Sequence, residues 1–564
     1  MSDHLELNYQ LAELPSAQHR AGLAGLVLMV RELKERQPQY LENREGAIID
    51  IEESNYSATL RLNLEGLKAL FDLTFKSFKD KRSTTNKIKN YDYIEEKEVE
   101  DNKGKTKIQT KYYYSVVVPH GAFLPYLDSS SDENKQGLWI KLWRDMLWNI
   151  VRGVPATRHP FNYRYDDQPY SKDAEKLWKE LKEPDKLTGQ SGNYYLGAMA
   201  SNPENVSTQD IIKYQFLLHF SPFVFQVYCS ATLDKDGKRN LNSYVLVIPD
   251  VANLKRFCKV FPDLLKNRGS LPLGKRKLPC DAVIDLAEEG ALNFFLLQDR
   301  VAKMMGDQKI RRLILGAEVI HAEKSGNTIK FKAINYVEPV KEIEDRYEQI
   351  RSNYYCPWFR KQRLLNLLNS KPKSNDLDAP LEEIPAWTGF DSLLSRIPRK
   401  WLDDPKSYFS HDARVLFEQE GGIKMQSDIR SYAEIVYRVC QHYVLSKLQS
   451  KYSYKWDKKL KKYIDAQQYI NTKSKVPIPD QEDGDKKKYK VTNEAFLAVR
   501  SRSEDKAFID YFASTLYPYI RKDEFADFAE RLFNHTDEIR SLTLLGLSSQ
   551  FPSTKKSKQE SEVA

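Results

Sequence analysis

The chain has few cysteines, and their spacing excludes the common cysteine-based sites. No two of the five lie in a C-x-x-C pair, so neither a zinc ribbon nor a disulfide framework is indicated. Scarce, scattered cysteine fits a reducing compartment, and we expect a cytoplasmic protein. The five positions are Cys229, Cys258, Cys280, Cys356 and Cys440.

Signatures of familiar enzymes are also missing. There is no G-x-x-x-x-G-K-[ST] phosphate loop and no H-E-x-x-H, and Asn193 stands where a G-x-S-x-G nucleophile elbow would need its last glycine. His411-Asp412 is an adjacent pair of metal-binding type, without a second ligand cluster nearby. We therefore predict a protein that is not an enzyme and needs no cofactor or metal. A nuclease with an unfamiliar site near His411-Asp412 is the alternative.

Long hydrophobic runs are absent as well. The apolar stretch from Ala21 to Val30 is too short to cross a bilayer, and no basic segment precedes it. We expect a soluble protein that is not exported and has no membrane partner.

Positive charge and aromatic rings are both plentiful. Lys and Arg number 88 against 79 Asp and Glu, a net charge of +9, and 12% of the residues are aromatic. A mild positive excess suits acidic partners, while rings either stack on bases or fill ordinary cores. A chain of 564 residues exceeds what one hydrophobic core usually serves, so several domains are expected.

Hydrophobic periodicity predicts an α+β protein: a hairpin-rich mixed N-terminal region followed by an all-α C-terminal helical bundle. The expected domains are 1–424, subdivided near 125–195, then 425–547, then a disordered tail at 548–564. His219 should be a core histidine within an apolar strand. Helices are expected at 23–33, 66–78 and 137–151, strands around Ser54-Asn55, hairpin turns at 101–104, 234–237 and 325–327, and a loop at 472–490.

The helical module contains a stretch, SKYSYKWDKKLKKYIDAQQYI, in which lysines alternate with aromatic rings. Cations neutralise phosphates and rings stack on unpaired bases, so this pattern indicates single-stranded nucleic acid. The alternative is a solvated helix face whose rings belong to the core. Candidate strand-binding residues are Lys451, Lys455, Trp456, Lys458, Lys459, Lys461, Lys462, Arg500 and Arg502.

Two segments together resemble a known family. ELNYQLAELPSAQHRAGLAGLVLMV at the N-terminus and FLLHFSPFVFQVYCSATLDKDGKRNLNSYVLVIPDVANLKRFC in the centre are similar to the large subunit of Cascade, the type I CRISPR surveillance complex, in its I-B or Myxan-like branch. The resemblance covers parts of residues 5–260 and rests on hairpin and helix signatures rather than on chemical motifs.

The resemblance implies a non-catalytic role beside a guide RNA. In that family the large subunit reads the protospacer-adjacent motif (PAM) of double-stranded target DNA, helps open the duplex and recruits a separate helicase-nuclease. Its C-terminal bundle resembles the small subunit that holds the displaced strand. The implied partners are the guide RNA, target DNA, the backbone and cap subunits of Cascade, the small subunit and the helicase-nuclease. A scaffold that binds protein partners alone is a further alternative.

Three segments could supply duplex contacts. Minor-groove reading needs slim polar or glycine-containing loops, often with an inserted wedge, and Gln190 is our candidate wedge. Each segment could instead be an ordinary turn or a solvated strand edge. The candidates are Gly189, Gln190, Ser191, Gly192 and Asn193; Lys266, Asn267 and Arg268 with Lys275, Arg276 and Lys277; and Lys105 and Lys107.

The residues before Met425 suggest an internal translation start. Glu420-Gly421-Gly422 can be encoded by a purine-rich ribosome-binding sequence, and no other methionine follows Met305. Small subunits in several related systems are second products of the large-subunit gene, so residues 425–564 are hypothesised to be made separately. The alternative is a Gly-Gly hinge before a helix.

Overall fold

The computed structural model forms two compact units, Met1–Pro339 and Val340–Ala564. The expected boundary at Met425 lies among residues that the structure does not describe, and it stays a prediction. The structure describes residues 4–100, 106–130, 137–151, 158–189, 196, 209–233, 239–269, 281–326, 328–339, 343–370, 384–398, 402, 407–419, 432–457, 459, 462–465 and 480–552.

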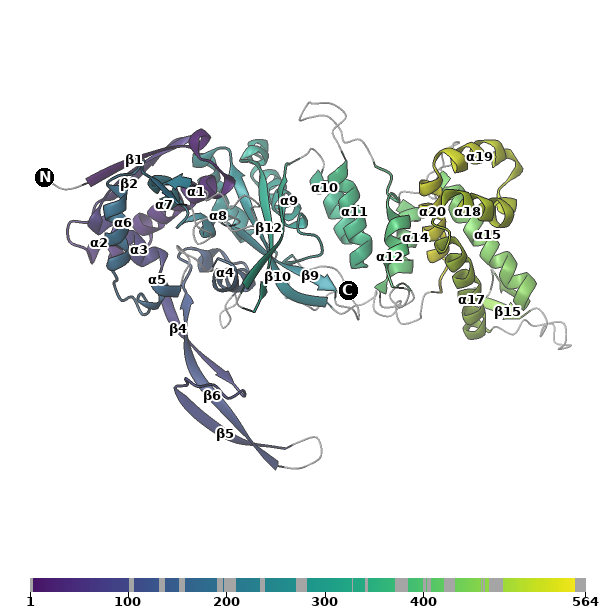
Figure 1. The fold of residues 1–564 in the computed structure, drawn as a ribbon, viewed down its shortest axis with the longest axis horizontal. Helices are drawn as coiled ribbons and strands as arrows, with labels where there is room; N and C mark the ends of the chain where they lie inside the picture. The colour runs from purple at the N-terminus through teal and green to yellow at the C-terminus, as the bar shows by residue number, and fades with distance from the viewer. Residues whose placement is uncertain are drawn as a thin grey trace. The chain divides into compact units, whose positions relative to one another are not determined.

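The first unit is built on a five-stranded sheet in the order β11-β9-β10-β12-β13. All neighbours are antiparallel except β11 and β9. Helices α1 and α9 pack on β10, and α4 packs on β9 (Figure 1). The expected hairpins around 234–237 and 325–327 are confirmed as β9–β10 and β12–β13. The bounds are β9 Gln226–Leu233, β10 Arg239–Val251, β11 Val283–Ile284, β12 Ile314–Ser325, β13 Thr328–Val337, α1 Ala17–Glu35, α4 Leu138–Asn149, α8 Leu254–Lys266 and α9 Glu289–Met305.

Helix α1 is buried along almost its whole length because small residues let other segments approach it. Ser16 caps its first turn by accepting a hydrogen bond from the His19 backbone N–H. A Cβ at Gly25 would lie 2.2 Å from the carbonyl oxygen of Phe220, so only glycine fits there. The helix expected at 23–33 is thus confirmed and is the central helix of this unit.

A second sheet, β1-β3-β2, lies beside helix α3. The two strands expected around Ser54-Asn55 are confirmed. The helix expected over 66–78 ends at Thr74, because Phe78 belongs to a strand that pairs with Val118. The bounds are β1 His4–Gln10, β2 Ile49–Glu53, β3 Ser57–Asn63, α3 Leu64–Thr74, α2 Gln39–Glu42, α5 Arg158–Asn162, α6 Lys172–Leu181, β7 Leu187–Gly189, β8 Gln209–Ile211 and α7 Ile212–Leu217.

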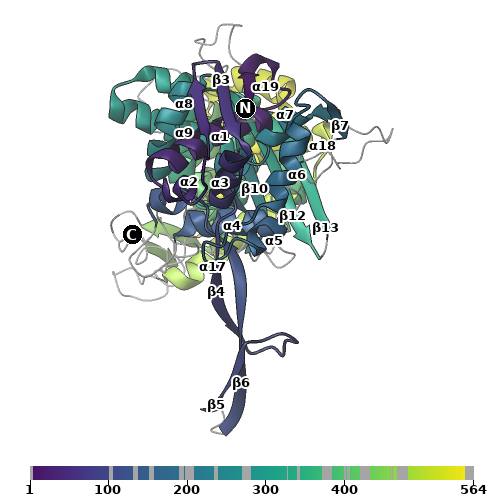
Figure 2. The same ribbon diagram turned by 90° about the vertical axis from the view of Figure 1, so that its left-hand side faces the viewer.

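An antiparallel arm, β4-β6-β5, projects from this unit (Figures 1 and 2). Its strands are β4 Ser77–Thr84, β5 Tyr93–Glu100 and β6 Thr106–Pro119. This confirms the hairpin expected around 101–104 and adds β4, which the sequence pattern did not indicate.

His219 is a core residue, as expected, but it does not lie in a strand. It follows α7 and its ring packs within 5.1 Å of the Phe71 ring, centroid to centroid. Burial lowers the pKa of His219 to about 4, so the ring is neutral at physiological pH. The apolar run around it forms short helical turns because its side chains pack against α1 and α3 rather than alternate between two faces.

The second unit is mostly helical, and its central helix is α20. That helix is buried on all sides, and α12, α14, α15 and α17 each pack against it (Figure 1). The bounds are α10 Ile343–Asn353, α11 Pro357–Asn369, α12 Phe390–Arg396, α14 Phe409–Gln419, α15 Tyr432–Tyr452, α17 Gln481–Arg500, α18 Asp505–Tyr511, α19 Phe525–Asn534 and α20 Thr536–Ser548.

Two details of the expected bundle are wrong. Within the lysine- and aromatic-rich stretch, β14 (Tyr454–Asp457) and β15 (Lys462–Asp465) form an antiparallel hairpin rather than helix, whereas the residues up to Tyr452 end α15. Of the loop expected at 472–490, residues 481–490 belong instead to α17, whose first turn is capped by the Asp480 carboxylate accepting the Asp483 backbone N–H at 3.0 Å; residues 472–479 lie outside the described residues. Glycine is needed at position 484 of the helix because Tyr463 packs where a Cβ atom would otherwise lie.

Candidate nucleic-acid interface

The β14–β15 hairpin sorts its rings inward and its lysines outward. Tyr454 and Tyr463 are buried and cluster with Leu448 of α15. Lys455 lies opposite Ile464 in the register, on the face away from that cluster, and is exposed. Alternation along the strands therefore produces a surface of cations above an aromatic base.

Trp456 remains partly available at the edge of this hairpin. Its ring meets the Tyr463 ring at 4.8 Å between centroids and an angle of 66°. The residue is 38% exposed. The register places Trp456 on the face of Tyr454 and Tyr463, whereas Lys462 at the start of β15 is exposed on the other face and Lys459 is exposed in the turn. A partly exposed ring at the edge of a hairpin whose other face carries cations suits stacking of an unpaired base from a strand that passes along that edge.

Other candidate cations of this unit already bind the chain itself. The Lys451 ammonium lies 2.9 Å from the Glu494 carboxylate, with both side chains about half exposed. Arg500 donates to the carbonyl oxygens of Ser395 and Ile397, at 3.1 and 2.8 Å. The Arg500 guanidinium is therefore already hydrogen-bonded within the chain.

Arg502 is engaged in the same way, and two lysines cannot be placed. The Arg502 guanidinium bonds the Ala498 carbonyl and lies 4.5 Å from the Tyr511 ring centroid. Lys458 and Lys461 lie outside the described residues. Among the described candidates, we call Lys455, Lys459 and Lys462, together with Trp456 at the edge, the basic hairpin.

The glycine-containing candidate loop begins at Gly189, which pairs with Gln209 at the end of β7. Gly189 is exposed, and a Cβ there would meet nothing within 4 Å. Gln190, Ser191, Gly192 and Asn193 lie outside the described residues. Their role as duplex contacts stays a prediction.

Two residues that the sequence pattern did not reveal hold the segments around this loop. Gln18 exchanges two hydrogen bonds with the Leu196 backbone, at 3.0 and 3.1 Å. The His19 ring lies between Ser16 Oγ, 2.7 Å from Nδ1, and Asp210, 2.9 Å from Nε2. A polar pair in the first turn of an otherwise apolar helix is the signal that could have found them.

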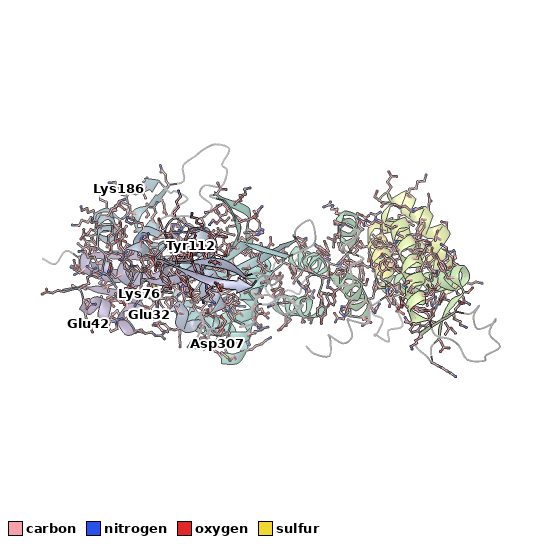
Figure 3. All side chains as sticks on the ribbon, turned by 90° about the horizontal axis from the view of Figure 1, so that it is seen from below. Glu32, Glu42, Lys76, Tyr112, Lys186 and Asp307 are labelled. Atoms are coloured by element: carbon pink, nitrogen blue, oxygen red, sulfur yellow. The ribbon has the colours of Figure 1, made fainter. Side chains whose placement is uncertain are left out.

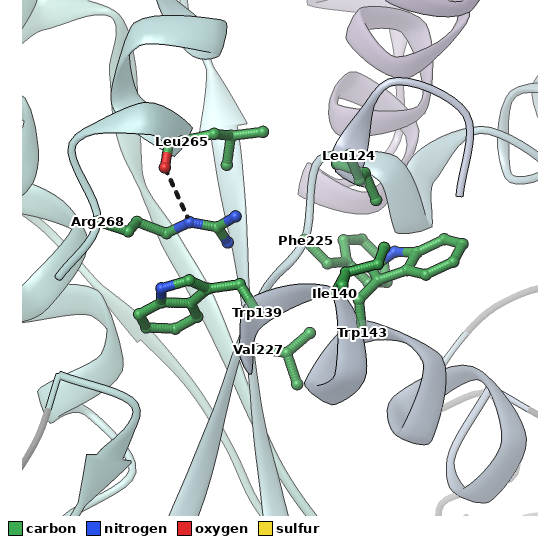
Figure 4. A pocket seen from close by; sticks show the side chains of 8 residues that line it. All are labelled: Leu124, Trp139, Ile140, Trp143, Phe225, Val227, Leu265 and Arg268. Atoms are coloured by element: carbon green, nitrogen blue, oxygen red, sulfur yellow. Dashed lines mark hydrogen bonds between the residues drawn. The ribbon is translucent and has the colours of Figure 1, made fainter. Parts of the chain in front are cut away.

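In the basic loop after α8, Lys266 is exposed to solvent whereas Arg268 is partly buried. Lys266 is exposed at the end of the helix, and the Asn267 amide donates to the Asp263 carbonyl at 2.8 Å. Arg268 lies 4.7 Å from the Trp139 ring centroid and donates to the Leu265 carbonyl at 3.3 Å (Figure 4). Burial lowers the pKa of Arg268 to about 10, so it stays charged at neutral pH.

Arg268 therefore stabilises the fold, and a phosphate would have to compete with these contacts. Lys275, Arg276 and Lys277 lie outside the described residues. Lys105 also lies outside them, whereas Lys107 is placed by its backbone in β6, opposite Val99.

The His411-Asp412 pair has a structural role at the start of α11. Asp412 is fully buried, and one carboxylate oxygen accepts the backbone N–H groups of Tyr355 and Cys356 at 2.9 and 2.6 Å. The other oxygen lies 3.0 Å from His411 Nδ1. Burial raises the pKa of Asp412. Asp412 thus ties the start of α11 to α14, and within the described ranges no three His, Cys, Asp or Glu residues gather as a metal site.

Comparison with protein-family models identifies the relatives of the chain. Residues 48–307 match the type I-B CRISPR Cas8b N-terminal domain, and residues 314–550 match the type I-B CRISPR Cas8b C-terminal domain. The chain belongs to the Cas8b family. A search of curated proteins found no match. The resemblance to a type I Cascade large subunit is thereby confirmed, in its I-B branch.

Membership of the Cas8b family gives the chain a place in a CRISPR Cascade complex. The match to the C-terminal family model begins at β12. The five-stranded sheet of the first unit therefore contains strands from both matched regions. None of the helices within the described ranges is long and apolar enough to cross a membrane.

Proposed function

We propose that this Cas8b chain is the non-catalytic large subunit of a type I-B CRISPR complex. It recognises the PAM duplex, helps form the R-loop, binds the displaced strand and recruits a separate helicase-nuclease. The observation that carries the proposal is the match to both Cas8b domains over most of the chain. The exposed cations and ring of the basic hairpin support the strand-binding part.

The division of labour follows from physical chemistry. In RNA-guided recognition the guide reads the target by base pairing, while protein supplies PAM contacts and neutralises backbones. The guide RNA, the backbone and cap subunits and the small subunit are accordingly its proposed partners. Asp412 offers no support for the nuclease alternative, because both of its oxygens already have partners.

The test is a binding assay of the assembled complex against target duplexes with randomised flanking bases. We expect a short flanking sequence to be enriched, and a complex without this chain to lose that preference. Binding that ignores the flanking bases in the complete complex would favour the scaffold alternative. Metal-dependent cleavage by the isolated chain, abolished by His411→Ala, would favour the nuclease.

We also propose that residues 425–564 are made as a second, small-subunit-like product. The proposal rests on Met425 and the preceding Glu-Gly-Gly sequence. Mass spectrometry of the purified complex should detect a chain that starts at Met425, and changing that codon to Leu should remove it. A complex that contains only the full-length chain would contradict the proposal.

A further inference from the structure

The projecting arm is a long two-stranded ribbon for most of its length. Strand β6 pairs with β4 over Tyr112–Pro119 and with β5 over Thr106–Tyr113, so the two partners follow one another along it. At about 3.3 Å per residue, the 14 residues of β6 span roughly 46 Å. Figures 1 and 2 show it extending away from the helices and sheets of its own unit.

The two faces of the ribbon carry opposite charge. Side chains alternate along each strand, and the register aligns Lys81 with Ser115, and Glu95 with Lys111. One face, the lysine face, therefore carries Lys79, Lys81, Lys97 and Lys111 with the carboxylate of Glu95. The other, the acidic face, carries Asp80, Glu96 and Glu98 with Arg82, and Tyr112 of β6, labelled in Figure 3, belongs to it.

Side-chain contacts agree with this sorting. The Tyr113 hydroxyl donates to Glu95 at 2.5 Å, and the Lys97 ammonium lies 3.1 Å from the same carboxylate. Those contacts lower the pKa of Glu95, first through the hydrogen bond from Tyr113. On the opposite face, Arg82 pairs with Asp80 at 3.1 Å.

The lysine face is open to a ligand. The Lys97 side chain is 66% exposed, and Lys79 and Lys81 are exposed as well. Lysine positions extend over the register from Gln109 to Val117, roughly 26 Å at 3.3 Å per residue. A row of cations along one side of a twisted ribbon complements an elongated helical polyanion.

We propose that the lysine face lies along the phosphate backbone of duplex DNA beyond the PAM. This inference rests on the proposed function, which brings target duplex to the complex. A two-stranded ribbon can enter a major groove, but there phosphates would flank both of its faces. Glu96 and Glu98 oppose that arrangement, so the ribbon contacts the outside of the duplex with one face. Such contacts add affinity without reading sequence.

The rings on this face favour a duplex over a single strand. Tyr93 stacks on Tyr113 at 4.5 Å and 9°, and Lys111 lies 5.3 Å from the Tyr113 ring centroid. Lys79 lies 3.8 Å from the ring centroid of Tyr165. Rings engaged with each other and with lysines stiffen the arm, whereas single-strand sites present free rings to successive bases.

The test compares a triple variant of the arm, Lys81→Gln, Lys97→Gln and Lys111→Gln, with a matched control in the assembled complex. The control is Lys172→Gln, Lys176→Gln and Lys179→Gln, which removes three exposed lysines from α6. Each complex is titrated, over a range of salt, with targets that carry either a few or about 25 base pairs of duplex beyond the PAM, and with the same targets in which the PAM is replaced.

We expect the arm variant to bind the long-flank target on the order of 40-fold more weakly at 0.15 M salt, with a salt slope lower by about 2. Glu95 offsets part of the lysine charge, so the change in salt slope should be smaller than the value expected for three lost phosphate contacts. Short-flank binding and the control should be unchanged. Equal affinity of variant and wild type on long flanks would overturn the proposal, as would an equal loss on both targets. Absence of any PAM preference in wild type would instead contradict the proposed function.

Discussion

Replacing Arg164 with alanine should destabilise the first unit by about 3 kcal/mol, because it removes a buried cation shared by the buried Asp72 and the partly buried Asp173 and leaves Asp72 with Arg44 alone. Arg164 is 1% exposed and donates to Asp72 at 2.8 Å and to Asp173 at 2.7 Å. It also donates to the Pro160 and Tyr170 carbonyls. The guanidinium thus joins α3, α5 and the start of α6.

Hydrogen exchange of peptides from α3 and α6 measures this loss within the full chain. Arg61→Ala is the matched control, since Arg61 also bridges two carboxylates, Glu6 and Glu52, but is 46% exposed. Its loss should have a much smaller effect, because ion pairs at the surface are screened by solvent and contribute little to stability. Equal exchange rates for Arg164→Ala and Arg61→Ala would show that burial of the Arg164 network contributes no extra stability.

Local pattern was enough to predict most of the first unit. Alternating residues indicated β2–β3, β5–β6, β9–β10 and β12–β13, and helical spacing indicated α1 and α4. Where an element buries one face, as β3 does with Ala58, Leu60 and Leu62, the period of its apolar residues reports its conformation. Strand β4 was not predicted because its sequence, SFKDKRST, has no alternation of apolar residues. Its conformation depends on pairing with β6.

The basic hairpin shows where local pattern fails. The pattern after Met425 predicts helix through this stretch, whereas residues 454–457 and 462–465 form strands. Contacts from distant residues decide otherwise: Tyr454 donates to Asp483 at 2.7 Å, and Tyr463 packs on Gly484. Both partners lie in α17, beyond an intervening segment, so tertiary packing overrides propensity.

The candidate cations could be identified from the sequence. Whether their donor groups are free to bind a ligand could not. Arg268 rests on Trp139, which is far away in sequence, and Arg500 bonds carbonyls of residues near 396. A single sequence shows that a residue is charged, whereas only the folded chain shows whether its donors already have acceptors. Lys455, Lys459 and Lys462 pass that criterion as exposed residues of the described chain.

Substituting Lys455, Lys459 and Lys462 with glutamine should weaken retention of the displaced strand by about 50-fold at 0.15 M salt. Each phosphate contact to a single strand contributes about 0.7 to the salt slope, so three contacts account for about 2. Glutamine removes the charge but keeps a flexible polar side chain, and these lysines are exposed to solvent, so the aromatic base of the hairpin should stay folded.

The assembled complex, titrated with target duplex at several salt concentrations, measures both quantities, and permanganate footprinting reports the displaced strand directly. The matched control, Lys506→Gln, Arg521→Gln and Lys522→Gln, removes three exposed cations elsewhere in the same unit and should change neither. Trp456→Leu separates stacking from charge: it should lower affinity by about 1–3 kcal/mol while leaving the slope unchanged. If the lysine variant keeps both the wild-type affinity and the wild-type slope, the displaced strand does not bind this hairpin.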